Sequence, residues 1–539
     1  MWLLGCGAVL VSAAPADPDE PIRQRLEELT AGAVARPAGV EFAAPALMQR
    51  LYAQRGFAPL WNDANARNLR ALLADAASHG LDPRDYLQTQ LNDYPLPGQL
   101  SGWARADADL LLTEAFLRYA YHCRFGKVDP GSLEPSWNYA RSATPAGVLA
   151  ALQRILNAPD FSAQFTIEMG HGPVYEGMRA LLARYRGYAA RGGWEALPAG
   201  DALREGDEGP SVAALRRRLA AEDLATRHAA SAVFDADLGA AVKQFQRRHG
   251  LIDDGIVGRQ TYAALNVDVQ VRIEQLRVNL ERLRWVLVDR APAFVAVNIA
   301  GFRVYYIEDD RVAWSARAVV GKPYRATPVF RAEMKYLVLN PDWTVPPTIL
   351  HQDVLPTMRK NPKYLAEQRM QVLDLQGNPV DAAQIDWSRY PGAPFPYLIR
   401  QLPGPTNALG RIKFMFPNPH FIFLHDTPSR ALFERGNRTF SSGCIRVEHP
   451  LELAAILLRD NPDWDRAALD AAVASDTTRT VFLEHPVPVL LLYLTAVAFD
   501  AGRDFAFYQD VYRRDAAVQR ALDADFRYVP PHGLENLSP

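Results

Sequence analysis

The period of the hydrophobic pattern changes near residue 290, and this change limits the chain to a fold with two kinds of structure. Before that point, apolar residues recur at helical spacing, as in residues 110–121 and 212–219. After it, apolar and polar residues alternate with period two, as in residues 294–299 and 312–320. The sequence therefore predicts a multidomain α+β protein in which helical units precede a mostly β unit.

The chain has 539 residues, too many for a single hydrophobic core. The expected boundaries are a signal segment at 1–14, a helical domain at 17–200, a three-helix bundle at 203–267, a linking helix at 271–290, a mostly β domain at 293–484, and a C-terminal strand and tail at 485–539. Within the β domain, residues 348–397 interrupt the strands with predicted helical pieces. An insertion of this length in a compact domain is usually functional.

Composition excludes several classes of function. A net charge of −2 gives no electrostatic basis for binding nucleic acid or an anionic membrane. The cysteines, Cys6, Cys123 and Cys444, are few and far apart, so neither a disulfide framework nor a zinc site is expected. Beyond the N-terminus, no apolar run approaches the ~18 residues of a membrane span. We therefore expect no metal, no cofactor and no transmembrane span.

Residues 1–14 are apolar and rich in small side chains, and they end near sites of the A-x-A type. The stretch lacks a basic beginning and is short, so we interpret it as a signal segment whose true start lies upstream. The run from Leu3 to Cys6 also resembles a lipoprotein processing site. We expect a periplasmic protein, with lipoprotein anchoring or attachment to the cell wall as alternatives.

The strongest chemical signal is a histidine followed by a cysteine in a small-residue turn. His425 ends an apolar run, and Cys444 follows Ser441, Ser442 and Gly443. A free thiol titrates near ~8.5, so a neighbouring imidazole that accepts its proton makes it a nucleophile at neutral pH. A glycine beside the thiol lets backbone amides turn toward an oxyanion. The stretch predicts Cys444 as nucleophile, His425 as general base and acid, and the Gly443 and Cys444 amides as oxyanion donors.

The segments HDTP and RTFSSGCIRV closely resemble the active site of the L,D-transpeptidases, with the Ser-x-Gly-Cys core at residues 441–444. The flanking sequence resembles the large Gram-negative members of that family. YAQRGFAPLW and GLDPRDY resemble their scaffold domain, and residues 203–267 resemble their small peptidoglycan-binding domain, although Arg259 stands where the family usually has proline. The alternative for residues 203–267 is a helical bundle without a ligand.

The resemblance implies a murein L,D-transpeptidase that serves cell wall biogenesis and cell shape. Cys444 would attack the carbonyl between diaminopimelate and D-Ala in a tetrapeptide stem, release D-Ala and keep a thioester. An amine of a second stem would then attack the thioester and form a 3→3 cross-link. The implied partners are peptidoglycan stem peptides and glycan, with other wall synthases or hydrolases as further candidates. Membership also implies a carbapenem target, acylated at Cys444.

Further residues are expected to support the substrate or the loop. Arg446 follows the nucleophile by two, and it binds a substrate carboxylate or braces the loop, with neither role favoured. Ser441 is expected to hydrogen-bond within the turn or to the substrate. In the family, the insertion at 348–397 is a mobile lid, and Trp343 stands at its entrance. Asn407 lies in PGPTNALG, which resembles a glycine-containing loop near the substrate.

Other enzyme classes, and other activities of the same residues, compete with the L,D-transpeptidase assignment. No HExxH cluster supports a zinc peptidase, and no Ser-x-x-Lys supports a serine D,D-enzyme. His420 and His449 are expected to be surface or supporting residues. An L,D-carboxypeptidase or hydrolase would use the same Cys444 and His425, and the chain could also be a non-catalytic peptidoglycan-binding scaffold, so both stay open.

Overall fold

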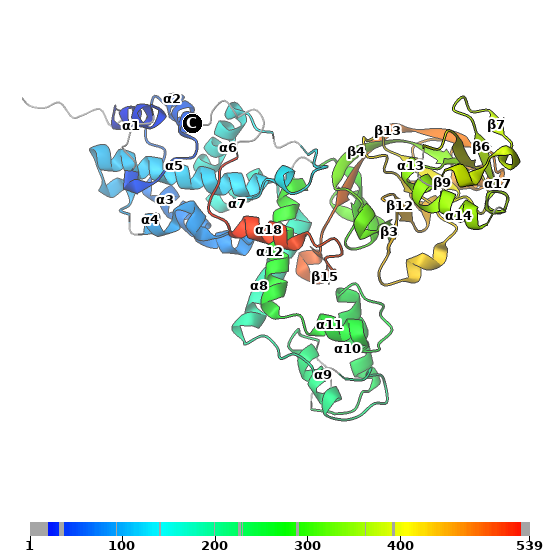
Figure 1. The fold of residues 1–539 in the computed structure, drawn as a ribbon. Helices are drawn as coiled ribbons and strands as arrows, with labels where there is room; N and C mark the ends of the chain where they lie inside the picture. The colour runs from blue at the N-terminus through cyan, green and yellow to red at the C-terminus, as the bar shows by residue number, and fades with distance from the viewer. Residues whose placement is uncertain are drawn as a thin grey trace, which may run out of the picture.

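The computed structural model describes residues 20–31, 37–92, 94–139, 142–198, 200–224, 228, 230–286, 290–361, 363–390 and 394–529. The predicted signal segment and Cys6 lie outside these residues. The structure contains a helical unit, a small helical bundle and a β barrel, in chain order (Figure 1). The multidomain α+β class predicted from the change of period is confirmed.

The first unit is built from helices around one apolar core. Its helices are α1 (Glu20–Thr30), α2 (Pro45–Ala53), α3 (Asp63–Ala74), α4 (Gln88–Asn92), α5 (Gly102–Phe125), α6 (Pro145–Asn157), α7 (Phe161–Met169) and α8 (Pro173–Ala190). Helix α5 is the central element and carries the predicted apolar run 110–121. Its buried Asp109 accepts hydrogen bonds from the amides of Leu60 and Trp61 and from Tyr52, so the carboxylate is satisfied inside the core.

The second unit is the predicted three-helix bundle. It comprises α9 (Pro210–Ala220), α10 (Ala236–Arg248) and α11 (Arg259–Leu265). Val212, Leu215 and Leu219 are fully buried against Phe245 and Leu265. Helix α12 (Val269–Val286) then leads away from the bundle and packs on α8 of the first unit. Figure 1 shows the bundle projecting from the junction of the two larger units.

The third unit is a closed barrel. Its strands are β1 (Ala293–Asn298), β2 (Arg303–Glu308), β3 (Arg311–Gly321), β4 (Phe330–Leu339), β9 (Ile412–Met415), β10 (Leu424–His425), β11 (Thr439–Ser441), β12 (Ile445–Val447) and β13 (Arg479–Leu492). They follow the order β11-β3-β12-β10-β9-β4-β13-β1-β2, and pairing of β2 with β3 closes the sheet. Inward-facing residues such as Val297, Leu337 and Leu424 fill the barrel. Helices α16 (Pro450–Leu457) and α17 (Arg466–Ala474) follow β12.

The insertion expected to hold only helical pieces contains a second sheet. Strands β6 (Met370–Leu373) and β7 (Pro379–Val380) lie in the insertion, and they form one sheet with β5 (Trp343–Thr344) and β8 (Leu398–Gln401), which flank it, in the order β5-β8-β6-β7. Helices α13 (Pro347–Ile349), α14 (Leu355–Lys360) and α15 (Tyr364–Glu367) and a π-helical turn at Leu350–Val354 accompany it. The strands have two to four residues, too few for a period-two pattern to show.

Two further expectations differ from the structure. The apolar run before His425 predicts a strand over 421–424, but only Leu424 of that run lies in a strand, β10, and Phe421 has a φ of 55° and is 85% exposed. The predicted boundary at 484/485 cuts through β13, which continues to Leu492 and pairs in parallel with β1. The end of the barrel therefore lies in the segment that was expected to follow it.

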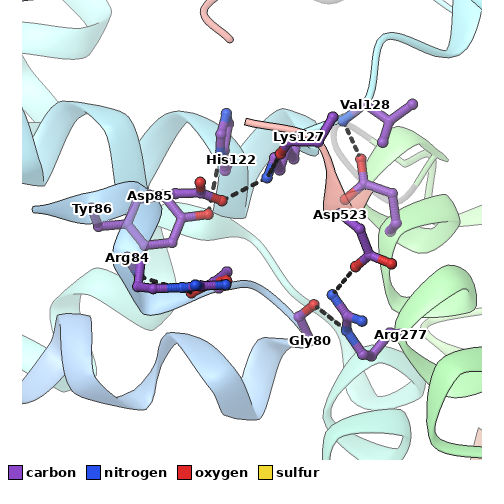
Figure 2. Close-up of polar contacts among 12 residues, drawn as sticks. Gly80, Arg84, Asp85, Tyr86, His122, Lys127, Val128, Arg277 and Asp523 are labelled. Carbon is purple, nitrogen blue, oxygen red and sulfur yellow. Dashed lines mark hydrogen bonds and ion pairs between the residues drawn. The ribbon is translucent and has the colours of Figure 1, made fainter. Parts of the chain in front are cut away.

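The C-terminal segment is not a tail over its described residues. The hairpin of β14 (Ala496–Phe499) and β15 (Asp504–Phe507) packs on α8, and α18 (Asp515–Asp523) packs on α12. Arg277 of α12 contacts Asp523 at 2.9 Å and Gly80 O at 3.1 Å, which joins three segments of the chain (Figure 2). The chain thus returns from the barrel to the first unit. No helix of the described residues has the length and apolar character that a membrane crossing requires.

Candidate active site

The predicted nucleophile and base lie on neighbouring strands and on the same side of them. His425 ends β10, and Cys444 directly precedes β12. The two strands are parallel, with Leu424 opposite Ile445 and His425 opposite Arg446. Because side chains alternate along a strand, Leu424 and Ile445 point into the barrel, whereas Cys444, Arg446 and His425 share its outer face. Paired strands are about 4.8 Å apart, so the two side chains lie on adjacent strands of one face.

His425 is held as a neutral base. Its ring is buried, and Nδ1 lies 2.6 Å from the carbonyl oxygen of Asp426. A carbonyl only accepts hydrogen bonds, so Nδ1 carries the proton and Nε2 is left as the acceptor. Burial, with the nearby positive charges of Arg446 and Lys413, lowers the pKa of His425 to about 3. The imidazole is therefore uncharged at neutral pH and able to take a proton.

The Cys444 thiol is also neutral in this state. Burial raises its pKa to about 11, although the positive charges of Lys413 and Arg446 act in the opposite direction. Its Sγ lies 3.7 Å from the carbonyl oxygen of Phe421. Thiol and imidazole form an uncharged resting pair, so the reaction requires transfer of the thiol proton as the nucleophile attacks.

Hydrogen bonds inside the turn fix the backbone before the nucleophile. Gly443 has a φ of 121°, a conformation that suits glycine alone. Ser441 Oγ donates to the Cys444 carbonyl at 2.6 Å and accepts the Gly443 amide at 3.1 Å. The Gly443 amide is thus engaged inside the turn, whereas the Cys444 amide donates to no group of the described residues. In this state, Cys444 itself supplies the available amide of the expected oxyanion pair.

Two residues that the sequence analysis did not single out, Thr327 and Tyr512, fix this turn in place through hydrogen bonds. Thr327 is fully buried, and its Oγ1 donates to the Gly443 carbonyl at 2.7 Å and accepts the Gly321 amide at 3.0 Å. Tyr512 accepts the Thr327 amide at 3.2 Å and donates to the Gly321 carbonyl at 2.6 Å. No local pattern could have revealed these contacts, because Tyr512 lies 185 residues after Thr327.

Comparison with known families gives the three units their identities. Residues 46–182 match the scaffold domain family, residues 208–265 match the family described as "Putative peptidoglycan binding domain", and residues 292–478 match the L,D-transpeptidase catalytic domain family. Residues 292–478 form an L,D-transpeptidase catalytic domain. The resemblance stated from the nucleophile segment is therefore confirmed for this domain.

Curated relatives agree with this identification over part of their length. A "Putative L,D-transpeptidase" of Haemophilus influenzae is 39% identical over 251 residues, which cover 46% of this chain and 49% of that protein. The N-acetylmuramoyl-L-alanine amidase CwlM of Mycobacterium tuberculosis is 48% identical over 75 residues, 12% of this chain and 18% of its own length. The chain thus spans about half the length, or less, of these relatives.

Solved structures resemble the chain less closely. An L,D-transpeptidase from Xylanimonas cellulosilytica has 18% identity and a TM-score of 0.17, and the match covers 55% of this chain and 98% of that one. An L,D-transpeptidase from Stackebrandtia nassauensis has 12% identity and a TM-score of 0.20, over 55% and 97% of the two chains. Scores this low support no conclusion about the arrangement of the units.

The insertion of the transpeptidase domain is tied to the nucleophile turn through Arg325, a third residue that the sequence analysis did not single out. Arg325 donates to Ser442 Oγ at 2.7 Å and to the carboxylate of Asp353 at 3.0 Å, and it also hydrogen-bonds the side chain of Gln352. Gln352 and Asp353 lie in the π-helical turn of the insertion, a kind of irregularity that often marks a functional site. One guanidinium therefore contacts both the insertion and the residue two before Cys444.

The other predicted supporting residues lie in different surroundings. Arg446 is partly buried, and its buried Nε has no hydrogen-bond partner among the described residues. Trp343 begins β5 and packs on the insertion's own apolar core. Asn407 is fully buried and bonds the Leu402 carbonyl at 3.0 Å and the Leu409 amide at 2.8 Å, so it shapes its loop.

The two flanking histidines make no contact with Cys444 or His425 in the described structure. The His420 ring packs on Phe330, with 5.1 Å between ring centroids. The His449 side chain is 59% exposed at the start of α16, beside Glu448. Across the described parts of the chain, no three His, Cys, Asp or Glu side chains are grouped so that they could hold a metal ion.

Proposed function

We propose that this protein is a murein L,D-transpeptidase that forms 3→3 cross-links through a thioester on Cys444. The observation that supports the proposal is the pairing of β10 with β12, which places a buried neutral imidazole and a partly exposed thiol on one outer face of the barrel. The catalytic domain match supports the same chemistry.

The first half of the reaction makes the acyl-enzyme. Cys444 Sγ attacks the carbonyl between diaminopimelate and D-Ala while His425 Nε2 accepts the thiol proton. The Cys444 amide stabilises the oxyanion, and a donor of this kind contributes about 3–4 kcal/mol in other acyl-transfer enzymes. His425 then returns the proton to the departing amine, so D-Ala leaves and a thioester remains.

The second half transfers the acyl group. An amine of a second stem peptide attacks the thioester, His425 accepts its proton, and the thiol regains a proton as the new amide forms. Water in place of the amine would give an L,D-carboxypeptidase from the same residues. Arg325 ties the insertion to the nucleophile turn, and closure of the insertion over that turn would favour the amine by excluding water.

The bundle at residues 208–265 supports peptidoglycan as the partner. We propose that it holds the glycan or stem peptides while the barrel acts on them, and that the protein works in the periplasm at the cell wall. Other wall synthases or hydrolases would meet it there.

The test is mass spectrometry of products from the purified full-length protein and a disaccharide-tetrapeptide. A product with the mass of two substrates less one D-Ala is expected, absent in Cys444→Ala and His425→Gln. Cys123→Ala is the matched control, because Cys123 is buried in the first unit and burial raises its pKa to about 12. Tripeptide without dimer would make the protein a carboxypeptidase. Untouched tetrapeptide, with retention on sacculi, would make it a wall-binding scaffold.

A carbapenem provides a second readout of the same thiol. Opening of the β-lactam ring by Cys444 adds the whole mass of the drug, so the intact protein should gain one adduct. Cys444→Ala should gain none, and an adduct on that variant would contradict the assignment of the nucleophile.

A further inference from the structure

Two cations lie on the outer face of the barrel that carries the thiol. Lys413 on β9 stands opposite His425 in the antiparallel register of β9 and β10. Arg446 on β12 stands opposite His425 on the other side. Lys413, His425 and Arg446 therefore lie side by side on the outer face of three neighbouring strands. Cys444 lies two residues before Arg446.

Neither cation has a carboxylate partner in the described structure. No ion pair within 4.0 Å joins Lys413 or Arg446 to an acidic residue of the described ranges, and Arg446 Nε is buried without a hydrogen bond. The Lys413 ammonium lies 4.1 Å from the ring centroid of Phe423. The negative charge of Asp342 favours the protonated form of Lys413 without an ion pair between them, and the Asp342 carboxylate is paired with Arg400 at 3.3 Å.

Two cations that are buried elsewhere in the protein have carboxylate partners: Arg284 is paired with Glu281 at 2.5 Å, and Lys127 with Asp85 at 2.7 Å. Lys413 and Arg446 are only partly buried, and a positive charge that loses part of its hydration without gaining a partner is unfavourable, so an anionic group would be stabilised between them. Two such charges on either side of the base indicate a place for a negatively charged group of the substrate.

We infer that Lys413 and Arg446 bind the C-terminal carboxylate of the residue that leaves the donor stem. This inference rests on the proposed function. In a tetrapeptide, the D-Ala carboxylate is three bonds from the carbonyl carbon that Cys444 attacks. A substrate placed for attack therefore carries this carboxylate onto the same outer face. A stem that is longer by one residue, or that ends in an amide, lacks a charge at that position.

The carboxylate site makes the enzyme specific for stems that end at the residue being removed. The carboxylates of diaminopimelate are the competing source of the same chemistry. A substrate amidated only at D-Ala and a substrate amidated only at diaminopimelate separate the two sources, since each removes one negative charge and leaves the scissile bond intact.

The experiment compares D-Ala or D-alaninamide release from three tetrapeptides: unmodified, amidated at D-Ala, and amidated at diaminopimelate. Full-length wild type and Lys413→Met are compared, with Lys413→Arg as the charge-keeping variant. Lys335→Met, which replaces an exposed lysine of β4, is the control. Lys413→Met should lower kcat/KM about 10- to 100-fold for the unmodified substrate, mainly through KM, the range expected for loss of a charged hydrogen bond. Its activity on the D-Ala-amidated substrate should fall by a clearly smaller factor, because Lys413 also acts on the charges of His425 and Cys444, and Lys413→Arg should recover part of the loss on the unmodified substrate.

Three results would overturn the inference. An equal loss on all substrates would mean that Lys413 acts on the thiol or the fold, which the pH profile of iodoacetamide alkylation and a thermal melt would distinguish. Wild type that does not discriminate against the D-Ala-amidated substrate would show that the charge is not bound. A loss confined to substrates with free diaminopimelate would assign the site to that carboxylate. Inactivity of wild type on every substrate would instead refute the proposed function.

Discussion

Replacing Arg325 with alanine should release the insertion from the nucleophile turn. Arg325 follows β3 in the short 3-10 turn Pro323–Arg325, and its side chain is 12% exposed between Ser442 on one side and Gln352 and Asp353 on the other. The substitution removes the contacts to the insertion and leaves the barrel core untouched. We therefore expect the closed position of residues 348–397 to lose stability while the domain stays folded.

The size of the effect follows from these contacts. The Asp353 carboxylate is 51% exposed, and ion pairs of this exposure contribute about 0–1 kcal/mol. The hydrogen bond from the guanidinium to Gln352 adds about 1 kcal/mol, a typical net value. The bond to Ser442 lies outside the insertion and adds nothing to this difference. A total of about 1–2 kcal/mol corresponds to a population of the open state that rises roughly 5- to 30-fold.

Hydrogen–deuterium exchange measures this population directly. Peptides over residues 350–360 of Arg325→Ala should exchange roughly 5- to 30-fold faster than in wild type. Arg359→Ala is the control, because among the residues that the structure describes Arg359 hydrogen-bonds within its own helix alone, to Leu355 O at 3.4 Å. Released tripeptide should also increase relative to dimer, since a more open insertion admits water. If exchange rises only around Ser442, Arg325 braces the nucleophile turn and does not hold the insertion.

Two further outcomes follow from the same site, and a third concerns His171 of the first helical unit, whose Nε2 lies 2.7 Å from the Cys123 carbonyl oxygen. Thr327→Val should cost about 1–3 kcal/mol in unfolding free energy and slow D-Ala release, because the Gly443 carbonyl and Gly321 amide lose a buried partner, whereas Thr327→Ser should retain both; thermal melts and product release test this. The rate of Cys444 alkylation by iodoacetamide should climb with pH toward about 11, and a plateau between pH 5 and 8 would reveal a thiolate–imidazolium pair instead. Burial lowers the pKa of His171 in the folded state to about 3, below the unfolded value of 6.5. Between pH 3 and pH 6.5 the unfolded state therefore binds more protons, and the free energy of unfolding should fall as the pH drops through that window. Melts recorded against pH should show His171→Gln with a weaker decline over that range, and an unchanged slope would refute the assignment.

Much of the fold is visible in the sequence where hydrophobic periodicity is long and regular. Strands β1 and β3 carry patterns of six residues or more, and their predicted ends lie within about two residues of the observed ones. The predicted helical run 110–121 lies inside the longer helix α5. The strands of the insertion are too short to show a period. Phe421 belongs to an apolar run yet lies outside the barrel, because its backbone conformation interrupts the strand.

The residues of the candidate site also differ in whether the sequence reveals them. Cys444 and His425 could be predicted because their residue types and local segment carry the chemistry. Thr327, Arg325 and Tyr512 could not, since their roles come from hydrogen bonds between segments far apart in the chain. The sequence motif locates the Gly443 amide next to the nucleophile. It does not show that this amide donates to Ser441 Oγ, because that hydrogen bond depends on the folded turn.

The charges around His425 connect the carboxylate inference to the chemistry. Burial is the main cause of the low pKa of the imidazole, and Arg446 and Lys413 lower it further; a base with a pKa of about 3 is a weak acceptor for a thiol proton. A carboxylate bound between the two cations would offset their positive charge and raise the pKa of His425. The same event would remove part of the stabilisation that the cations give to a Cys444 thiolate. Binding of a stem with a free C-terminus should therefore make His425 a stronger base and Cys444 a weaker acid, so the group that selects the substrate also changes the protonation equilibria of both.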